Sequence, residues 1–301
     1  MVHNTVDWQA ISTHISDTTG QYFEVQTHYP IAGGCINHVY RIEGAGQNYF
    51  VKLNDVNKLD MFIAEAMGLA ELGQPAVIKV PVPICWGKTS EHAYLVLEYL
   101  LLRRDNLQYS SAKFGQQLAV MHHVSCTPVP FGWYRDNYIG TSLQTNTLTF
   151  DWVEFWRHQR LGYQLQLAAK NGYYGELQNL GMQLMEELDL FFTTYQPFNS
   201  LLHGDLWSGN YDVDIHGEPV IFDPAMYYGD READIAMTEL FGGFHSSFYD
   251  AYQATWKLDE GYTVRKNLYN LYHILNHLNL FGGGYLAQAE RMMRQLLSEL
   301  H

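Results

Sequence analysis

The sequence predicts an α+β protein of two lobes, with a small β-rich lobe at the N-terminus and a larger, mainly helical lobe at the C-terminus. Two observations carry this prediction. The chain has 301 residues, which is longer than single hydrophobic cores usually grow. Short β-type runs dominate before about residue 101, whereas apolar residues recur at helical spacing after Arg103. We therefore expect one lobe over residues 1–101 and the other over residues 102–301.

The N-terminal third contains three β-type runs and one helical pattern. "HVYRIEG" at 38–44 and "NYFVKLN" at 48–54 are separated by glycine-containing residues and predict a hairpin. "AYLVLEYL" at 93–100 predicts a third, strongly apolar strand. Between them, residues 59–73 have apolar side chains near helical spacing and stop at Gly73, which predicts a helix with a glycine C-cap.

The remaining two thirds are predominantly helical. Residues 131–150 have no clear periodicity and are expected to form an ordered surface loop. Two short strand-like runs lie at 211–215 and 219–223. Apolar residues at i, i+3 and i+4 spacing predict helices over 111–124, 151–172, 180–195 and 266–281.

Net charge and the distribution of charged residues argue against two classes of partner, nucleic acids and membranes. The formal charge is −14, from 32 acidic and 18 basic residues, so no basic surplus exists to neutralise the phosphates of a nucleic acid. The stretch 271–289 has no charged residue, but its histidines, asparagines and glycines make it a poor membrane span. We therefore expect neither a nucleic-acid nor a membrane partner.

Cysteine usage and the first residues of the chain indicate a cytoplasmic protein. The three cysteines, Cys35, Cys85 and Cys126, are odd in number and lack metal-site spacing, which favours a reducing compartment. The first residues lack the basic and apolar regions of a signal peptide. The histidines show no metal-ligand spacing and are expected to be structural or exposed: His122, His123, His273 and His277.

The stretch "LLHGDLWSGN" at 201–210 contains the strongest chemical signal. Asp205 and Asn210 stand five residues apart, and "VIFDPA" ends an apolar strand on Asp223 thirteen residues after Asn210. Phosphoryl transfer from ATP needs a carboxylate to accept the proton of an attacking hydroxyl, and oxygen ligands to hold Mg²⁺. The protein-kinase motif H-R-D-x-x-x-x-N has the same interval and is followed by a metal-binding aspartate. This pattern predicts an ATP-dependent phosphotransferase.

The N-terminal third supplies the expected lysine and glutamate of such a site. "YFVKLN" places Lys52 on a strand, as in the kinase V-A-I-K motif, whose lysine contacts the nucleotide phosphates. Glu65 follows thirteen residues later on the predicted helix and is positioned to form an ion pair with Lys52. A strand lysine taken alone is usually exposed to solvent, so the order of all the pieces carries this interpretation.

The predicted contacts to the nucleotide also include a glycine-rich loop and a hinge. Gly33 and Gly34 in "IAGGCINHVY" would let backbone N–H groups approach the phosphates. Glu98 and Leu100 are the expected hinge residues whose backbone binds the adenine edge. Cys35 lies in the glycine-rich loop, where two interpretations stand: a redox-sensitive thiol, or a small residue that fits the loop.

These motifs resemble the fructosamine-3-kinase, or ketosamine-3-kinase, family, which belongs with the aminoglycoside phosphotransferases and choline kinases in the protein-kinase-like fold. The resemblance covers residues 20–285 and is carried by "LLHGDLWSGN", "IFDPAMYYGDREADIAMTELFGGF", "GGCINHVYRI", "FIAEAMGLAEL", "DNYIGTSLQTN" and "DWVEFWRHQRLGYQLQLA". The tryptophan in the first motif and the "DNYIG" segment are specific to the family.

The resemblance implies transfer of the ATP γ-phosphate to the 3-hydroxyl of a ketosamine, a fructosamine or ribulosamine adduct of lysine or another amine, which leads to deglycation. Asp205 would be the general base, with Asn210 and Asp223 as Mg²⁺ ligands. His203 and Gly204 stand where protein kinases have His-Arg. Without that arginine, regulation by activation-loop phosphorylation is not expected.

Residues for structural support and for the substrate are also suggested. Asp234 resembles the aspartate that accepts hydrogen bonds from the catalytic-loop backbone, although a helix N-terminal acid also interacts with the helix dipole. Asp230, Arg231 and Glu232 fit either the same polar network or a solvated turn. The candidate substrate contacts, which include the loop around Gly140, are Trp207, Asn137, Tyr138 and Arg160.

Each substrate candidate has an alternative interpretation, and so does the function. Trp207 fits stacking on a sugar or packing between the lobes, and Arg160 fits a substrate contact or a surface ion pair. The alternatives to a ketosamine kinase are a kinase for an aminoglycoside, choline or a sugar, and a nucleotide-binding module without transfer activity. The sequence leaves open the preferred sugar, the amine and the oligomeric state.

Overall fold

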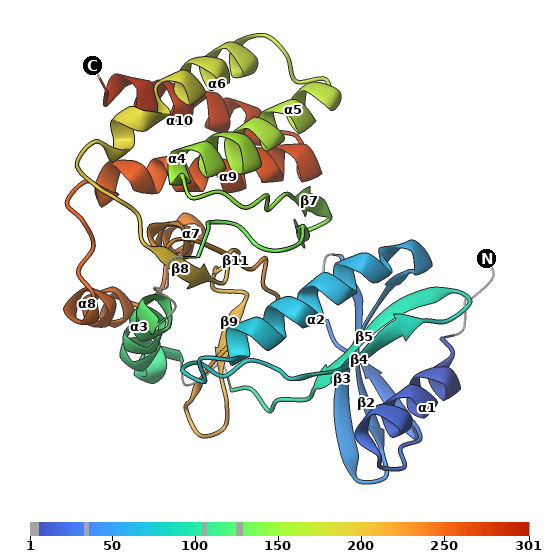
Figure 1. Ribbon diagram of the computed structural model, residues 1–301. Helices are drawn as coiled ribbons and strands as arrows, with labels where there is room; N and C mark the ends of the chain where they lie inside the picture. The colour runs from blue at the N-terminus through green and yellow to red at the C-terminus, as the bar shows by residue number, and fades with distance from the viewer. Residues whose placement is uncertain (1–5, 33–35, 104–106, 125–128, 301) are drawn as a thin grey trace.

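The computed structural model describes residues 6–32, 36–103, 107–124 and 129–300. Figure 1 shows the two lobes, with the N-terminal sheet in blue to cyan beside the larger helical part in green to red. The bilobal α+β architecture predicted from the sequence is confirmed.

The N-terminal lobe is an antiparallel five-stranded sheet with one helix on each face. Its strands are β1 (Thr27–Pro30), β2 (His38–Gly44), β3 (Gln47–Asp55), β4 (Pro83–Lys88) and β5 (His92–Glu98), in the order β1-β2-β3-β5-β4. The helices are α1 (Trp8–Thr19) and α2 (Leu59–Gly73), with a 3-10 turn, η1 (Val56–Lys58), before α2.

Alternation along β5 explains why both faces are covered. Leu95 and Leu97 belong to the apolar cluster that contains α2 residues such as Phe62. Val96, which points the other way, packs in a second cluster with Ile11 of α1. The strongly apolar run that predicted this strand is therefore a strand buried on both sides.

The end of α2 differs from the predicted glycine C-cap. Gly73 is the last helical residue, and the following Gln74 keeps right-handed helical backbone angles. A Cβ on Gly73 would lie 3.1 Å from Val80 Cγ2, so close packing favours a glycine at this position. The chain reverses later, at Ala76, whose φ is +53°.

The chain leaves the N-terminal sheet after β5 and joins the other lobe almost at once. Leu102 forms a β-bridge with Asp214, and the Arg103 N–H donates to Val213 O at 2.7 Å. The segment before β4 also crosses between the lobes, because Lys79 bridges Val220. These backbone contacts lie next to the boundary expected at residues 101 and 102.

The C-terminal lobe consists of helices around three small two-stranded sheets. Its strand pairs are β6 (Asn137–Ile139) with β7 (Ser142–Gln144), β8 (Asn199–Leu202) with β11 (Tyr227–Asp230), and β9 (Tyr211–Val213) with β10 (Pro219–Ile221). Its helices are α3 (Leu107–Val124), α4 (Trp152–Phe155), the π-helical turn η3 (Trp156–Gly162), α5 (Tyr163–Lys170), α6 (Glu176–Glu186), the 3-10 helix η4 (Leu188–Phe192), α7 (Glu232–Leu240), α8 (Ser246–Thr255), α9 (Tyr262–Phe281) and α10 (Tyr285–Ser298).

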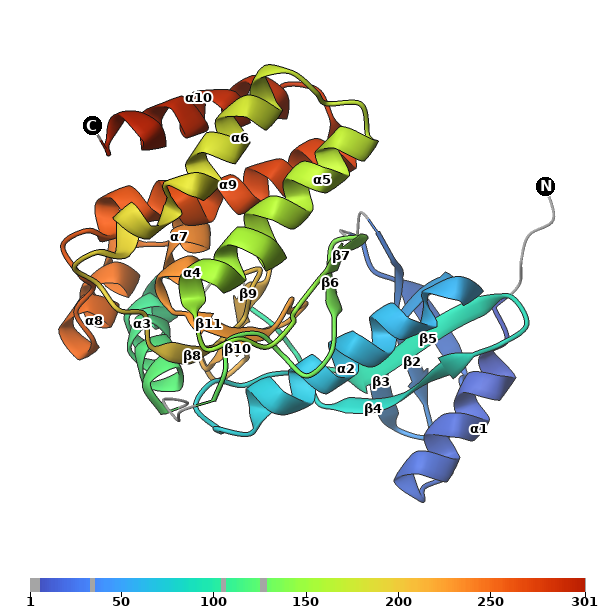
Figure 2. The same cartoon turned by 45° about the horizontal axis from the view of Figure 1, so that its top comes forward.

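Residues 131–150 are not the surface loop that the sequence predicted. They contain the β6–β7 hairpin, which Figure 2 shows between α2 and the helical bundle. Asn137, Gln144 and Asn146 are each at most 3% exposed, and their side-chain amides bond to one another. The polar composition that resembled a surface loop instead forms a buried hydrogen-bonded network, because each amide has both a donor and an acceptor.

Among the described residues, no helix is both long and apolar enough to cross a membrane.

Candidate active site

Lys52 forms an ion pair that joins the two lobes. It lies on β3 with 3% of its surface exposed. Its Nζ lies 2.5 Å from Glu65 Oε1 on α2 and 2.5 Å from Asp223 Oδ1, which follows β10. The structure thus joins three of the residues that the sequence singled out, from three separate elements.

The Lys52 ammonium balances two carboxylates that repel each other in a partly desolvated place. Burial alone would lower the pKa of Lys52, but the carboxylates of Asp223 and Glu65 outweigh it and the net shift is upward. Burial raises the pKa of Glu65, against the opposing effect of Lys52. The Asp223 side chain remains 47% exposed, so it stays accessible beside a buried cation.

The candidate catalytic loop, residues 203–210, turns sharply at Gly204. This residue has a φ of +81°, in the left-handed region that glycine adopts without a steric penalty. A Cβ there would lie 2.0 Å from Ala225 O, so side chains are also excluded by contact. At the position where protein kinases have an arginine, the neighbouring backbone therefore leaves no room for a side chain.

His203 connects this loop to the segment that carries Asp223. Its Nε2 lies 2.9 Å from the carbonyl oxygen of Phe222, so Nε2–H donates, and Nδ1 accepts from the Asp205 N–H at 3.3 Å. The ring is fully buried, and burial lowers its pKa. A neutral histidine in one tautomer thus fixes Asp205 relative to Asp223.

Asp205 is the candidate general base. Asn210 Nδ2 donates to Asp205 O at 2.9 Å and lies 3.4 Å from both Asp205 Oδ2 and Asp223 O. Burial raises the pKa of Asp205, and the nearby Asp223 carboxylate raises it further, to about 7. A carboxylate with this pKa is a better proton acceptor near neutral pH than an ordinary aspartate.

The donor set at this place suits a magnesium ion bound together with a nucleotide. No cluster of three or more histidine, cysteine or acidic side chains suited to a metal occurs in the described part of the chain. Magnesium in phosphotransferases commonly takes several of its ligands from phosphates and water, so one or two protein oxygens are enough. The half-exposed Asp223 carboxylate offers such oxygens, and Asn210, whose Nδ2 lies 3.4 Å from Asp223 O, carries an amide oxygen on a neighbouring loop.

Asp234 binds the backbone of the candidate catalytic loop. Its carboxylate, 1% exposed on α7, accepts from the backbone N–H of His203 at 2.7 Å and of Gly204 at 2.8 Å. Burial alone would raise the pKa of Asp234, but the interaction with His122 and the hydrogen bond from the Gly204 N–H contribute to a net lowering. The bracing geometry predicted for Asp234 is therefore present.

His122 is a residue that the sequence left without a role. It is fully buried on α3, with Nε2 3.3 Å from Asp234 Oδ2 and Nδ1 2.9 Å from the Tyr252 hydroxyl. Arg231 also donates to that hydroxyl, at 3.0 Å. The sequence showed only that His122 lies in a helical pattern. No local signal indicated its contact with Asp234, which is 112 residues away.

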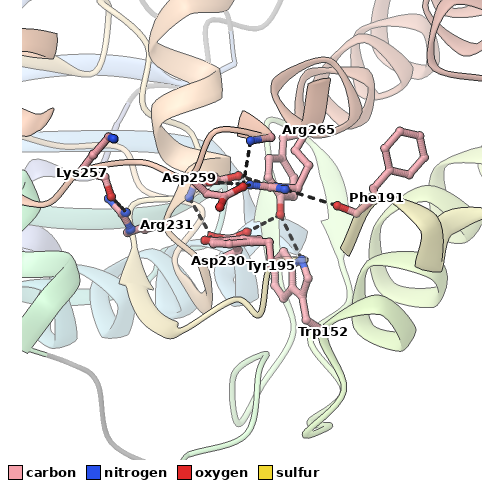
Figure 3. A network of polar contacts seen from close by, with 11 residues as sticks. Trp152, Phe191, Tyr195, Asp230, Arg231, Lys257, Asp259 and Arg265 are labelled. Carbon is pink, nitrogen blue, oxygen red and sulfur yellow. Dashed lines mark hydrogen bonds and ion pairs between the residues drawn. The ribbon is translucent and has the colours of Figure 1, made fainter. Parts of the chain in front are cut away.

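Asp230, Arg231 and Glu232 form a buried network and not a solvated turn. Tyr195 and Tyr269 donate to the two oxygens of Asp230, at 2.9 and 2.5 Å. Glu232 forms a bidentate pair with Arg265, at 2.8 and 3.0 Å. Figure 3 shows Arg265 reaching Asp259 in the same cluster. This cluster holds the junction of β11 and α7, directly before Asp234.

The predicted nucleotide loop lies outside the part that the structure describes, and the hinge lies at the end of the sheet. Gly33, Gly34 and Cys35 fall among the residues outside the described ranges. The Glu98 N–H donates to Val82 O at 2.8 Å, and Leu100 follows the end of β5. Contacts of Gly33, Gly34, Glu98 and Leu100 with a nucleotide stay predictions, and so does the redox sensitivity of Cys35.

Of the substrate candidates, Trp207 is exposed and Tyr138 is partly buried. Trp207 is 39% exposed, and its indole covers Gly209, where a Cβ would lie 2.3 Å from the ring. Tyr138 lies on β6 and its hydroxyl donates to Asp60 Oδ2 at 3.3 Å. The exposure of Trp207, two residues from Asp205, fits a surface beside the reacting groups better than packing between the lobes.

The other two substrate candidates are structural, which corrects the sequence-based interpretation. Asn137 is 3% exposed and its amide donates to Met226 O at 2.6 Å. Arg160 is fully buried in the π-helical turn, where it donates to Thr145 O at 2.6 Å and to Asn146 Oδ1 at 2.9 Å. Its guanidinium lies 4.0 Å from the Tyr227 ring centre, so it is neither a surface ion-pair partner nor available to a substrate.

Comparison with known proteins identifies the family. The fructosamine kinase family model matches residues 7–299. A probable ketoamine kinase of Synechocystis sp. is 47% identical, with 98% of this chain and 99% of that protein covered. A chloroplastic protein-ribulosamine 3-kinase of Arabidopsis thaliana is 38% identical, with 94% of this chain and 86% of that protein covered.

Solved structures show the same fold. The crystal structure of a candidate fructosamine-3-kinase from Haemophilus somnus 129PT has a TM-score of 0.88 at 31% identity and covers 96% of this chain and 97% of that one. An aminoglycoside phosphotransferase in a ternary complex with AMP-PNP and hygromycin B has a TM-score of 0.64 at 14% identity, covers 96% of this chain and 98% of that one, and shows the fold alone. The chain therefore belongs to the fructosamine kinase family and is a phosphotransferase that acts on a hydroxyl group.

Proposed function

We propose that this protein transfers the γ-phosphoryl group of ATP to the 3-hydroxyl of ketosamines, namely fructosamine or ribulosamine adducts of lysine or other amines. The hydroxyl oxygen forms a bond to the γ-phosphorus while the bond from that phosphorus to the β–γ bridging oxygen breaks. ADP leaves, and Asp205 takes the hydroxyl proton. Magnesium, held by Asn210 and Asp223, would neutralise charge on the β- and γ-phosphates.

The observation that carries this proposal is the convergence of Lys52, Asp205, Asn210 and Asp223 on one place. Lys52 contacts Asp223, and Asn210 contacts both aspartates through its amide. A proton acceptor, a cation and metal-binding oxygens side by side are what phosphoryl transfer requires. The names of the relatives, ketoamine kinase and ribulosamine 3-kinase, support the ketosamine as acceptor.

Trp207 is our candidate for the sugar contact. Its exposed indole lies on the catalytic loop, and an aromatic face suits the apolar face of a sugar ring. If it stacks there, Trp207→Leu should raise KM for the ketosamine with little effect on KM for ATP. Trp207→Phe should recover much of the affinity, because the aromatic face is retained.

The chemical consequence of the reaction would be repair. A phosphate on the 3-oxygen is a far better leaving group than a hydroxyl, so the phosphorylated adduct is labile and frees its amine. The protein would thereby start a deglycation sequence, whose second step is elimination of the phosphate.

The test is a panel of acceptors with Mg²⁺ and ATP: ribulosyl-lysine, fructosyl-lysine, free sugars, choline and aminoglycosides. We expect ADP formation with a ketosamine, and ³¹P NMR of the product to show a phosphate ester at the 3-position. No ATP consumption with any ketosamine would refute the proposal, and turnover of an aminoglycoside or choline alone would favour that alternative.

The same panel tests the role of Asp205. Asp205→Asn should lose at least about 10²-fold in kcat, the low end for general acid–base catalysis, while nucleotide affinity changes little. Asp17→Asn, a change of the same kind at an exposed site on α1, should leave kcat unchanged. Near wild-type turnover in Asp205→Asn would show that the base is another group.

A further inference from the structure

One segment of the C-terminal lobe contacts both elements that carry the partners of Lys52. We call this segment, residues 131–146, the interlobe strap. It includes the β6–β7 hairpin and lies against α2, which carries Glu65. It also lies against residues 225–228, which directly follow Asp223.

The contact with α2 uses one stripe of that helix. Asp60 accepts from Arg135 at 2.6 Å, and Met67 Sδ lies 3.1 Å from the Arg135 guanidinium. Glu71 Oε2 accepts from the Trp133 indole N–H at 2.8 Å. Asp60, Met67 and Glu71 are spaced by seven and four residues, so they share one helix face.

Glu65 does not belong to that stripe. At 100° per residue, it stands about 140° around the helix from Asp60 and points to Lys52 instead. The helix therefore has one face for the strap and another for the lysine. Any rotation or shift of α2 against the strap would displace Glu65 from Lys52.

The contact with the segment after Asp223 uses buried amides and backbone. Asn137 donates to Met226 O at 2.6 Å, and Gln144 donates to Ala225 O at 2.9 Å. Gly132 and Tyr228 exchange two backbone hydrogen bonds, at 2.8 and 2.9 Å. The strap is thus fixed to the chain two to five residues beyond Asp223.

Glu71 of α2 contacts both the interlobe strap and the strand that follows Asp223. Its Oε1 accepts from the Tyr228 hydroxyl at 2.8 Å, while Oε2 accepts from Trp133. Trp133 is 3% exposed, so its N–H has Glu71 in place of water. One carboxylate on α2 is therefore bonded both to the strap and to the strand that follows Asp223.

From these contacts we propose that Glu71 is a positioning residue for the nucleotide site. Through the interlobe strap it holds α2 and the Asp223 segment in register, so that Glu65 and Asp223 meet Lys52 together. In protein kinases the corresponding helix is positioned by activation-loop phosphorylation. Here fixed hydrogen bonds would do this without a covalent modification. The inference goes beyond the proposed acceptor, because it concerns the nucleotide side of the site.

The test compares three variants of α2 for affinity towards Mg²⁺·AMP-PNP, measured by calorimetry without any acceptor. Glu71→Ala removes both hydrogen bonds and should weaken nucleotide affinity about 2- to 30-fold, the range for coupling through a packed network. Glu71→Gln should rescue it to within about twofold, because an amide accepts from Trp133 and donates to the Tyr228 hydroxyl. Ala70→Gly, at an exposed neighbour, destabilises the helix without touching the strap and should leave affinity unchanged.

Unchanged affinity in Glu71→Ala, or equal weakening in Ala70→Gly, would overturn the proposal. If Glu71→Ala does not fold, Tyr228→Phe removes one of the two bonds and should weaken nucleotide binding in the same direction by a smaller factor; no weakening there would also overturn it. The experiment measures nucleotide affinity without an acceptor. Its result can therefore be interpreted even if no ketosamine is turned over.

Discussion

Lys52 Nζ lies 2.5 Å from Asp223 Oδ1, although the two residues are 171 positions apart in the chain. The contact joins the N-terminal sheet directly to the segment after β10 that carries Asp223, one of the two candidate magnesium ligands. Glu65 holds the same ammonium from the other side. The lysine that would receive the nucleotide phosphates is thus already ordered by two carboxylates.

Removing the lysine should destabilise the protein as well as abolish turnover. Lys52→Met leaves the Glu65 carboxylate, 12% exposed, without its cation, and breaking a buried pair in this way costs about 3 kcal/mol or more. Adding Glu65→Leu should recover much of the free energy of unfolding but none of the kcat. Urea denaturation and steady-state assays check both.

The matched control for that change is Lys113→Met. Lys113 pairs with Glu218, but their side chains are 46% and 44% exposed. We expect a change below about 1 kcal/mol, as for surface ion pairs. Equal losses for both lysines would show that burial of the Lys52 cluster contributes nothing.

Protonation of Asp205 should stabilise the protein in the absence of nucleotide and metal. Its pKa in the folded state is raised to about 7, so the folded state binds this proton more tightly than the unfolded state. The contribution is complete below about pH 4, the ordinary aspartate value, and is lost as the pH rises to about 7. The free energy of unfolding of wild type relative to Asp205→Asn should therefore fall across this window and level off above it. Parallel pH profiles of the two proteins would contradict this prediction.

Loss of the Asp234 carboxylate should release the catalytic loop. Asp234→Ala leaves the buried N–H groups of His203 and Gly204 without their acceptor, which we expect to cost about 3 kcal/mol and to lower kcat. Asp234→Asn keeps one good acceptor and should fall between Asp234→Ala and wild type. Thermal denaturation and kcat measure the two effects. Asp250→Asn, at an exposed site on α8, should change neither, and an equal effect there would argue against a specific role for Asp234.

Gly204→Ala should prevent the backbone of residues 203–210 from adopting its sharp turn. The methyl group would lie 2.0 Å from Ala225 O, and φ is +81° as well, so the backbone itself must move. Gly172→Ala meets only the second problem, because its φ is +92° and no atom lies within 4 Å of the new Cβ. We expect loss of activity and a low yield of folded protein for Gly204→Ala, but only about 1–2 kcal/mol for Gly172→Ala. Circular dichroism and kcat compare the two, and similar outcomes would show that contact with Ala225 is unimportant.

Several parts of the site were predictable because their signals are local. The strand that carries Lys52 and the helix that carries Glu65 have clear periodicities, and Asp205, Asn210 and Asp223 stand at motif intervals. Backbone geometry and alternation along the chain set such features. The strand, the helix and the motif intervals can therefore be recognised from the sequence alone.

Arg160 shows where local patterns mislead. Its helix looked amphipathic, with an arginine expected at the surface or at the substrate. The turn at 156–162 is π-helical, which shifts the side chains around the axis relative to a regular α-helix, and Arg160 turns inward among aromatic rings. Gly162 allows this turn, since a Cβ there would lie 2.7 Å from Arg157 O.

The sequence by itself determined the two-lobed fold class and singled out the candidate reacting groups, because periodicity and motif spacing depend on neighbours along the chain. Only the tertiary structure decided which polar residues are scaffold: Glu71 meets Trp133 across 62 positions and Tyr228 across 157. Asn137 and His122 likewise became internal supports once burial forced their polar atoms to find partners. The physical reason is that these hydrogen-bond partners are brought together by packing between distant segments, and no local pattern in the sequence specifies which distant segments meet.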